Sequence, residues 1–242
     1  MVRKILNYTI SIIIILSIWI AAAKIISAPL ILPYPFEVIK IAGKLITTLT
    51  FWKAFLHTFL RVVISFVISV TMGTALGVIC ASSKNLQEIF ELPLSIVRST
   101  PVVAIILITL FWFTSKTVPV VVAVLMALPI MTANVTKGFS QADKSLENMA
   151  IGFQLTKKQI FKYIKIPSAM PLFFSGCEAI FGLCWKVVVA GEVLSLPKNG
   201  CGTLMQQSQV HLETGNVIAV TLIVVLVSYI LQKLLGMIKW QK

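Results

Sequence analysis

The sequence predicts an all-α membrane protein that crosses the bilayer six times, and its composition, apolar runs and basic residues all support this fold class. Of the 242 residues, 58% are hydrophobic and only 12% are charged, whereas a soluble domain is about 45–50% apolar and about 25% charged. So few charged side chains cannot cover the surface of a soluble core of this size. The composition therefore excludes a soluble globular protein, and the high hydrophobicity excludes a disordered chain.

Six apolar stretches are long enough to span a membrane, since a helix needs roughly 20 residues to cross a hydrocarbon core about 30 Å thick. The first stretch follows basic residues and exceeds the apolar core of a signal peptide, so we interpret it as a retained anchor. The predicted spans are residues 5–26, 58–82, 92–113, 118–135, 172–194 and 217–237. Together they predict a single transmembrane domain over residues 1–242.

Basic residues gather on the cytoplasmic side of membrane proteins, so their distribution predicts the orientation of the chain. If the N-terminus lies inside, twelve lysines and arginines fall in cytoplasmic segments and five fall on the opposite side. We therefore expect both termini to be cytoplasmic. The net charge of +13 then reflects topology and contact with membrane lipid, and no nucleic acid is expected as a partner.

Two connections between the predicted spans are too long to be simple turns. Residues 29–57 contain Leu32-Pro33-Tyr34-Pro35, which we expect to be extended because proline restricts the residue before it. Residues 36–45 then have the pattern of a helix lying at the outer surface of the membrane. The other connection, residues 137–170, is basic and cytoplasmic in this topology.

Residues 137–170 predict two short helices. Asp143 or Ser145 can cap the first helix, and Thr156 and Gln159 have capping-box spacing at the start of the second. The second helix would carry apolar side chains on one face and stop at a proline; these residues are Ile160, Phe161, Ile164 and Pro167. Exposed apolar residues on such helices favour docking of a soluble partner. The alternative is a loop that packs on its own membrane domain.

The same loop resembles the EAA loop of ABC importer permeases. The similar residues are Glu147-Asn148-Met149-Ala150, then Phe161, then Lys165-Ile166-Pro167-Ser168-Ala169-Met170-Pro171. Further stretches make the chain similar to the nitrate/taurine/sulfonate type of the binding-protein-dependent inner-membrane component family; they are residues 32–38, 57–62, 98–101 and 185–192. Because the similarity runs through nearly the whole chain in the right order, it is more specific than any single motif.

This resemblance implies the fold of a type I ABC importer permease, with a coupling-helix loop between the fourth and fifth spans, in the inner membrane of a bacterium. It implies two permease subunits side by side, expected to be a homodimer, with cytoplasmic ABC ATPase subunits and an extracytoplasmic solute-binding protein as partners. The ATPase would bind Mg-ATP, so no cofactor is expected in this chain. The resemblance does not name the substrate, because such permeases carry small anions, sulfonates or vitamin precursors.

The resemblance also assigns a set of residues to ATPase docking and coupling. Counted back from Pro167, the usual glycine of the family falls at Gln154 and its usual glutamate at Asn148. Gly152 and Glu147 lie beside these positions, and either they substitute or the turn is built differently. The assigned residues are Glu147, Asn148, Met149, Ala150, Gly152, Phe153, Gln154, Phe161 and Pro167.

A stripe of small residues recurs every four positions along the second predicted span. Small side chains at this spacing let another helix approach closely, and Gly73 and Gly77 form a GxxxG pair. The stripe predicts a packing face without specifying a dimer. Its members are Ser65, Ser69, Gly73, Gly77 and Ala81.

Charged residues at membrane depth need a partner or water, because each costs at least about 2.5 kcal/mol on an insertion scale. The fifth predicted span carries Glu178, Lys186 and Glu192, which either line a translocation pathway or form ion pairs between helices. Glu192 lies near the outer end, so we expect it to be the most hydrated of the three. Arg98 begins the third span near the cytoplasmic face and is expected to reach the interface.

No catalytic or metal-binding pattern is found in the sequence. It lacks a P-loop, an HExxH motif and a nucleophile elbow, and its four cysteines have no CxxC spacing. We therefore expect a non-enzymatic permease subunit that couples to a separate ATPase. The alternatives are an ATPase-independent channel or secondary transporter, and a membrane enzyme or scaffold subunit.

Overall fold

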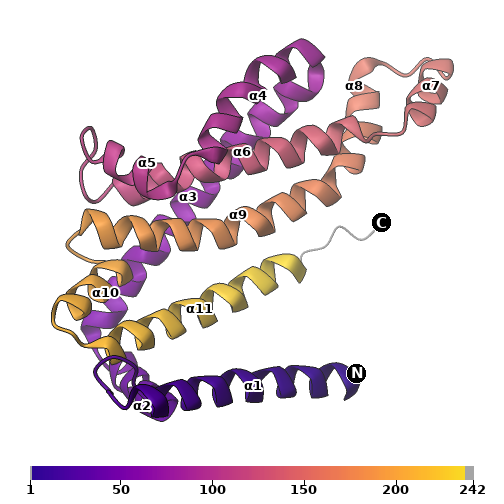
Figure 1. Ribbon diagram of the computed structural model, residues 1–242. Coiled ribbons are helices and arrows are strands. Elements are labelled where there is room, and N and C mark those ends of the chain that lie inside the picture. The colour runs from indigo at the N-terminus through magenta and orange to yellow at the C-terminus, as the bar shows by residue number, and fades with distance from the viewer. Residues whose placement is uncertain (1, 238–242) are drawn as a thin grey trace.

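In the computed structural model, which describes residues 2–237, all regular structure within that range is helical. The long helices α6, α9, α11 and α1 run in roughly the same direction in Figure 1, where α1 is indigo and α11 is yellow. The helices are α1 (Val2–Ile26), α2 (Pro35–Ile46), α3 (Leu49–Ser82), α4 (Lys84–Ser99), α5 (Val102–Thr109), α6 (Val118–Ser140), α7 (Lys144–Gly152), α8 (Lys157–Ile160), a π-helical turn (Phe161–Lys165), α9 (Ile166–Ser195), α10 (Cys201–Val210) and α11 (Thr214–Met237).

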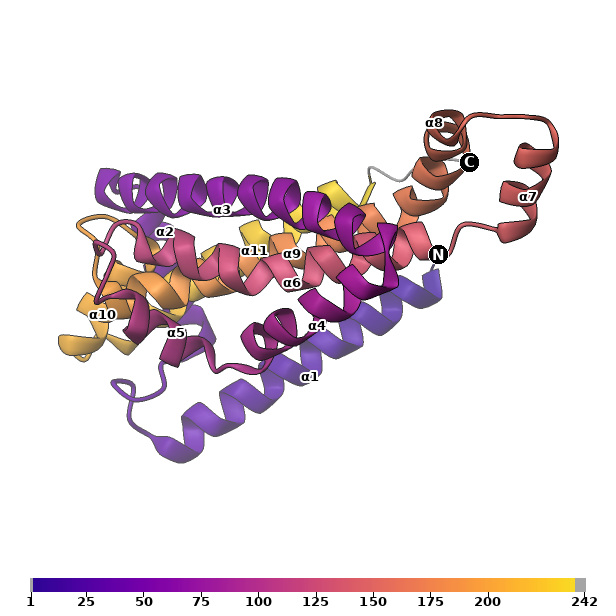
Figure 2. The same cartoon turned by 90° about the horizontal axis from the view of Figure 1, so that it is seen from above.

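Five stretches of helix are long and apolar enough to cross a membrane, and α4 with α5 makes a sixth if this bent pair is one span. The N-terminus and α7 lie at one end of the molecule, here called the α7 end, and α5 and α10 lie at the other, the α10 end (Figures 1 and 2). The five stretches are Thr9–Ile26, Leu49–Ser82, Val118–Ser140, Lys157–Ser195 and Thr214–Met237.

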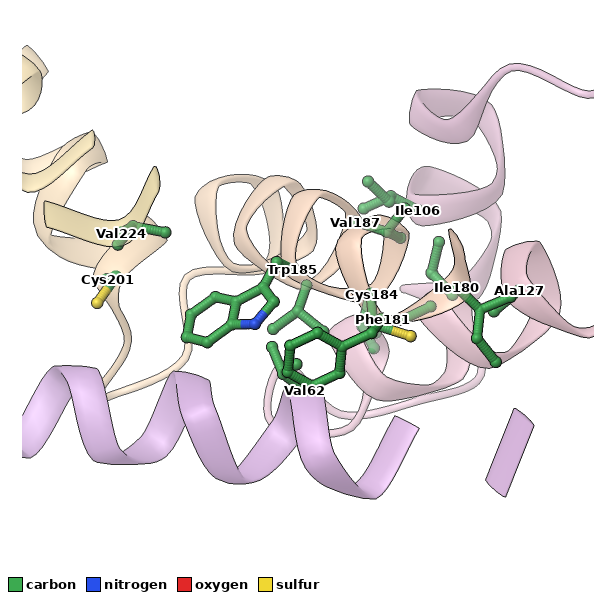
Figure 3. Close-up of a cluster of buried hydrophobic side chains, with 14 of the residues drawn as sticks. Val62, Ile106, Ala127, Ile180, Phe181, Cys184, Trp185, Val187, Cys201 and Val224 are labelled. Atoms are coloured by element: carbon green, nitrogen blue, oxygen red, sulfur yellow. The ribbon is translucent and has the colours of Figure 1, made fainter. Parts of the chain in front are cut away.

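The core of the molecule lies where α6 packs between α3 and α9. Fully buried side chains such as Val122 and Met131 of α6 lie in the same apolar cluster as Ile180 of α9. In Figure 3, Phe181 and Trp185 of α9 lie beside Val62 of α3. By contrast, only 6% of the membrane-length part of α1 is buried, so this helix must present its apolar surface to lipid or to another protein.

The third predicted span, residues 92–113, is not one helix. The chain bends by 95° between α4 and α5, because Thr100 is extended with ψ of 132° before Pro101. The proline ring collides with the residue before it, so that residue avoids the backbone dihedral angles of an α-helix. The second predicted span also differs, since α3 begins at Leu49 rather than at residue 58.

The sequence predicted that Pro167 stops the second helix of the 137–170 loop, and this prediction is wrong. Helix α8 runs through the π-helical turn into α9, and Pro167 lies in the first turn of α9. Proline lacks a backbone N–H and its ring collides with the carbonyl four residues earlier. A π-helical turn directly before it changes the hydrogen-bond pattern at that point, so the helix continues past the proline.

Candidate functional site

Of the two caps that the sequence offered for α7, Asp143 and Ser145, the structure has Asp143. The backbone N–H of Ser145 donates to Oδ1 of Asp143 at 2.8 Å, and this hydrogen bond holds the pKa of the Asp143 carboxyl below its ordinary value. The capping box at the start of α8 is also present, because the side chains of Thr156 and Gln159 each bond the backbone N–H of the other. The sequence predicted both helix starts correctly.

The turn that follows α7 is built around Gln154. This residue is left-handed, with φ of 59°, and the N–H of Leu155 donates to the carbonyl oxygen of Ala150 at 3.0 Å. Gly152 lies within α7, and a Cβ added there would meet nothing within 4 Å. The chain therefore makes the left-handed turn at Gln154 itself, where the family's glycine was expected, and Gly152 does not replace it.

Two contacts hold the α7–α8 region in place, one between α7 and the π-helical turn and one between that turn and α6. Nζ of Lys165 lies 3.3 Å from Oε2 of Glu147, and the rings of Phe161 and Phe139 stack with centroids 5.4 Å apart. Ala150 is only 4% exposed, so it packs inside the loop and is not available to a partner. Ala150 thus supports the loop rather than forming its contact surface.

The outer side of α7 is apolar and exposed. Leu146, Met149 and Phe153 recur at positions i, i+3 and i+7, so they share one face of the helix. Their exposed fractions are 43%, 54% and 74%. We call these three residues the docking face, because a helix that projects from the α7 end (Figure 2) with such side chains offers a surface for another protein.

A cavity of about 680 Å³ with both polar and apolar lining opens between α4, α6 and the end of α3. It runs along α6 from Ser140 to Pro129, which corresponds to about 16 Å of helix. Arg98 is among its lining residues, and its Nη2 donates to the carbonyl oxygen of Pro129 at 3.3 Å. Sequence reasoning missed this cavity. The polar residues that recur every three or four positions along residues 84–98 were a signal that could have indicated it.

At the α10 end, charged and polar side chains form a buried cluster that we call the clasp. Nη1 of Arg61 lies 2.6 Å from Oε1 of Glu192. The Thr58 hydroxyl donates to Oε2 of Glu192 at 2.8 Å and accepts from the N–H of Cys201 at 2.8 Å. The N–H of Gly202 donates to Oε2 of Glu192 at 3.0 Å, so the carboxylate also caps the start of α10.

The clasp corrects one expectation from the sequence. Glu192 was expected to be the most hydrated charge of its span, but its side chain is 0% exposed and forms an ion pair between α9 and α3. Sequence reasoning missed Arg61 as its partner, although an arginine inside an apolar span is itself a signal that a partner exists. The other two charges of α9, Glu178 and Lys186, are exposed and form no ion pair within the described residues.

The small-residue stripe packs against α6. A Cβ added to Gly73 would lie 2.6 Å from Cβ of Met131, and one added to Gly77 would lie 2.6 Å from Cβ of Val135. Ser65 and Ser69 are fully buried on the same side, whereas Ala81 is only partly buried and Cys80 is buried instead. A four-residue spacing rotates by about 40° per step around a helix, which explains why the stripe ends before Ala81.

No group of three or more metal-ligating side chains is found among residues 2–237. The four cysteines carry free thiols. Cys201 lies at the start of α10, where burial raises the pKa of its thiol to about 12, so it remains protonated at neutral pH and is a poor nucleophile.

Comparison with known proteins gives a consistent result. Residues 73–238 match the family described as "Binding-protein-dependent transport system inner membrane component". The taurine transport system permease protein of Escherichia coli is 22% identical over 90% of this chain and 82% of its own length. The nitrate import permease protein of a Synechocystis strain is 29% identical, but the match covers 55% of this chain and about half, 49%, of that relative.

Solved structures share the fold at low sequence identity. The inward-facing MetNI methionine ABC transporter matches with a TM-score of 0.62 and 17% identity over 77% of this chain and 91% of that one. An amino acid ABC transporter matches with a TM-score of 0.58 and 17% identity over 74% of this chain and 89% of that one.

Proposed function

The chain belongs to the family of binding-protein-dependent transport system inner membrane components, and we propose that it is the permease subunit of an ATP-driven ABC importer. In this role it forms the solute pathway and hydrolyses no ATP itself. A separate cytoplasmic ATPase binds Mg-ATP and docks at the α7 end. An extracytoplasmic solute-binding protein delivers solute at the α10 end, and the N-terminus is cytoplasmic.

The docking face carries this proposal. Leu146, Met149 and Phe153 are apolar and exposed on a helix whose base is held by the Glu147–Lys165 ion pair. Burying such side chains against a partner is favourable by roughly 25 cal/mol for each square ångström of apolar surface. The rigid base lets a movement of the partner pass into α9, because α8 and α9 are joined through the π-helical turn.

The transport cycle that we propose is alternating access. The ATPase pair binds one conformation of the permease better when ATP is bound, and this difference in affinity shifts the pathway between inward-facing and outward-facing states. A second permease subunit, expected to be another copy of this chain, completes the pathway. Its surface would also cover part of the apolar side chains that the single chain exposes. Glu178 and Lys186 of α9 are exposed and are candidates for the pathway.

The proposal is tested by placing a charge on the docking face. We expect Met149→Arg to insert into the membrane and to elute as a single symmetric peak, but to lose the co-purifying ATPase and ATP-dependent uptake. The matched control is Gly43→Ala in α2, outside the α7–α8 region, because its Cβ would meet no other atom within 4 Å. It should keep both the ATPase and the uptake. Met149 is preferable to Ala150 for this test, since Ala150 is buried.

The opposite outcome would favour another transport class. If the solubilised chain carries no ATPase and still moves solute in vesicles, the importer proposal fails and an ATPase-independent channel or secondary transporter takes its place. If Met149→Arg retains the ATPase and normal uptake, the docking face is not the coupling surface.

A further inference from the structure

Helix α2 packs on the start of α11 with one of its sides. Pro35 and Val38 are buried on this side. Ile41 touches Gly215, because a Cβ added to this glycine would lie 2.6 Å from Cδ1 of Ile41. Figure 1 shows α2 at the α10 end, beside the end of α1. The helix covers the residues that the sequence predicted to form a helix at the membrane surface, and its other sides are left uncovered.

The uncovered part of α2 has an apolar side and a basic side. Phe36, Ile39 and Ile46 are 77%, 64% and 43% exposed and fall within about 80° of the helix circumference. Lys40 and Lys44 are also exposed, and Lys40 follows Phe36 by four positions, so the basic side lies directly beside the apolar one. A helix with apolar residues on one side and lysines next to them is typical of a bilayer surface.

The apolar side of α2 continues into the exposed side of α3. The indole N–H of Trp52 donates to the carbonyl oxygen of Ile46 at 2.7 Å, so this side chain joins the start of α3 to the end of α2. Trp52, Leu56 and Leu60 recur every four residues and are 47–55% exposed, on a helix long and apolar enough to cross a membrane. Tryptophan is enriched where the hydrocarbon meets the headgroups. The bilayer that covers α3 therefore also reaches α2.

The basic side of α2 lacks an acidic partner. Neither Lys40 nor Lys44 forms an ion pair within residues 2–237. The carboxylate of Glu37 accepts from the N–H of Tyr34 at 3.3 Å, at the start of the helix. A lysine beside an apolar surface keeps its carbon chain on that surface and extends its ammonium to the headgroup phosphates. An anionic headgroup fits two such ammonium groups better than a zwitterionic one, which carries its own cation.

We propose that α2 lies flat in the bilayer surface at the α10 end and binds anionic phospholipid through Lys40 and Lys44. Phe36, Ile39 and Ile46 enter the acyl chains beside it. A soluble protein seated on α2 would not account for the apolar residues that continue from Ile46 along α3. The inference concerns the lipid around this chain and does not depend on the ATPase.

The depth of α2 is measured with a fluorescent label. We would introduce Phe36→Cys, attach bimane in the full-length chain, and reconstitute it in phosphatidylcholine vesicles. A lipid nitroxide near the glycerol should quench the label more strongly than one near the acyl terminus or aqueous iodide, because an interfacial helix buries its apolar side only about 5–10 Å deep. Gln209→Cys on the exposed part of α10 is the control and should be quenched chiefly by iodide. The wild-type chain, treated in parallel, corrects for native thiols.

The same label measures headgroup preference. The vesicles would contain either nitroxide-labelled phosphatidylglycerol, an anion, or phosphatidylcholine with the nitroxide at the same acyl position. Phosphatidylglycerol should reach half of its maximal quenching at a several-fold lower mole fraction. Lys40→Gln with Lys44→Gln should abolish this preference. Lys198→Gln removes a positive charge from an exposed residue just before α10, so the preference should remain.

Two outcomes would overturn the inference. If iodide quenches the Phe36→Cys label and lipid nitroxides do not, α2 lies clear of the bilayer and serves a soluble partner instead. If both labelled lipids quench equally in the chain that retains its lysines, α2 does not select anionic headgroups. The importer proposal is judged separately by the co-purifying ATPase, so either result can stand without the other.

Discussion

At the α10 end, the buried carboxylate of Glu192 pairs with Arg61 and accepts hydrogen bonds from Thr58 and Gly202. At the α7 end, Arg98 and Lys137 line an open cavity, and Met149 and Phe153 project outward. Both ends contain side chains whose placement costs free energy in a membrane protein. Only at the α10 end does the chain itself supply their partners.

This difference separates structural charges from functional ones. A buried ion pair that also caps α10 joins α3, α9 and α10, so its role is complete within one chain. Cations that line a cavity without an ion-pair partner, and apolar residues on a projecting helix, find a partner only in a ligand or another protein. Substitutions at the α10 end should therefore affect stability, whereas substitutions at the α7 end should affect coupling and leave stability nearly unchanged.

The largest expected effect comes from breaking the clasp. Arg61→Met leaves the carboxylate of Glu192 buried without its cation, which typically costs about 3–5 kcal/mol. For a chain of this size that corresponds to a fall of roughly 10 °C in the unfolding midpoint, measured as loss of the monodisperse peak after heating in detergent. Lys186→Met is the control, because Lys186 is an exposed cation on the same helix as Glu192.

A double substitution sharpens this prediction. Arg61→Met with Glu192→Gln removes both charges, so part of the lost stability should return because a neutral amide is less costly to bury than a carboxylate. An equal fall in the midpoint for Lys186→Met would instead mean that the clasp has no special structural role.

A smaller effect is expected where α3 packs against α6. In Gly77→Ala the new methyl group would lie 2.6 Å from Cβ of Val135 and 3.0 Å from the carbonyl oxygen of Thr132, so the two helices must separate. Such overpacking typically costs about 1–3 kcal/mol, and the same heating assay measures it. Gly43→Ala in α2 is the control, since its Cβ would meet no atom within 4 Å and alanine favours a helix. A midpoint for Gly77→Ala at or above that of wild type would refute the close approach.

Local patterns in the sequence predicted the parts of the fold that depend on neighbouring residues. The caps at Asp143 and Thr156 and the packing stripe that includes Gly73 and Gly77 follow from fixed spacings along one helix. Such spacings determine which groups face each other without any knowledge of the tertiary structure.

Long-range contacts were not predictable in the same way. Glu192 meets Arg61 across 131 positions of sequence, and nothing local indicates that pairing. The break before Pro101 was visible as an X-Pro step, but the apolar run around it favoured one continuous span. Passage of the helix through Pro167 depends on a π-helical turn that no composition rule anticipates.

The smallest effect concerns the cap of the docking helix. The hydrogen bond from Ser145 lowers the pKa of Asp143 below its ordinary value of 3.8, so the cap is fully stabilising above that pH and is lost as the pH falls through the lower, folded-state pKa. Amide exchange at Ser145, corrected for its intrinsic rate, should therefore accelerate at low pH in the wild-type chain. Asp143→Asn keeps an uncharged cap and should remove this pH dependence. If the asparagine variant accelerates equally, acid acts elsewhere in the α7 end, and the docking helix is held by its Glu147–Lys165 and Phe161–Phe139 contacts instead of its cap.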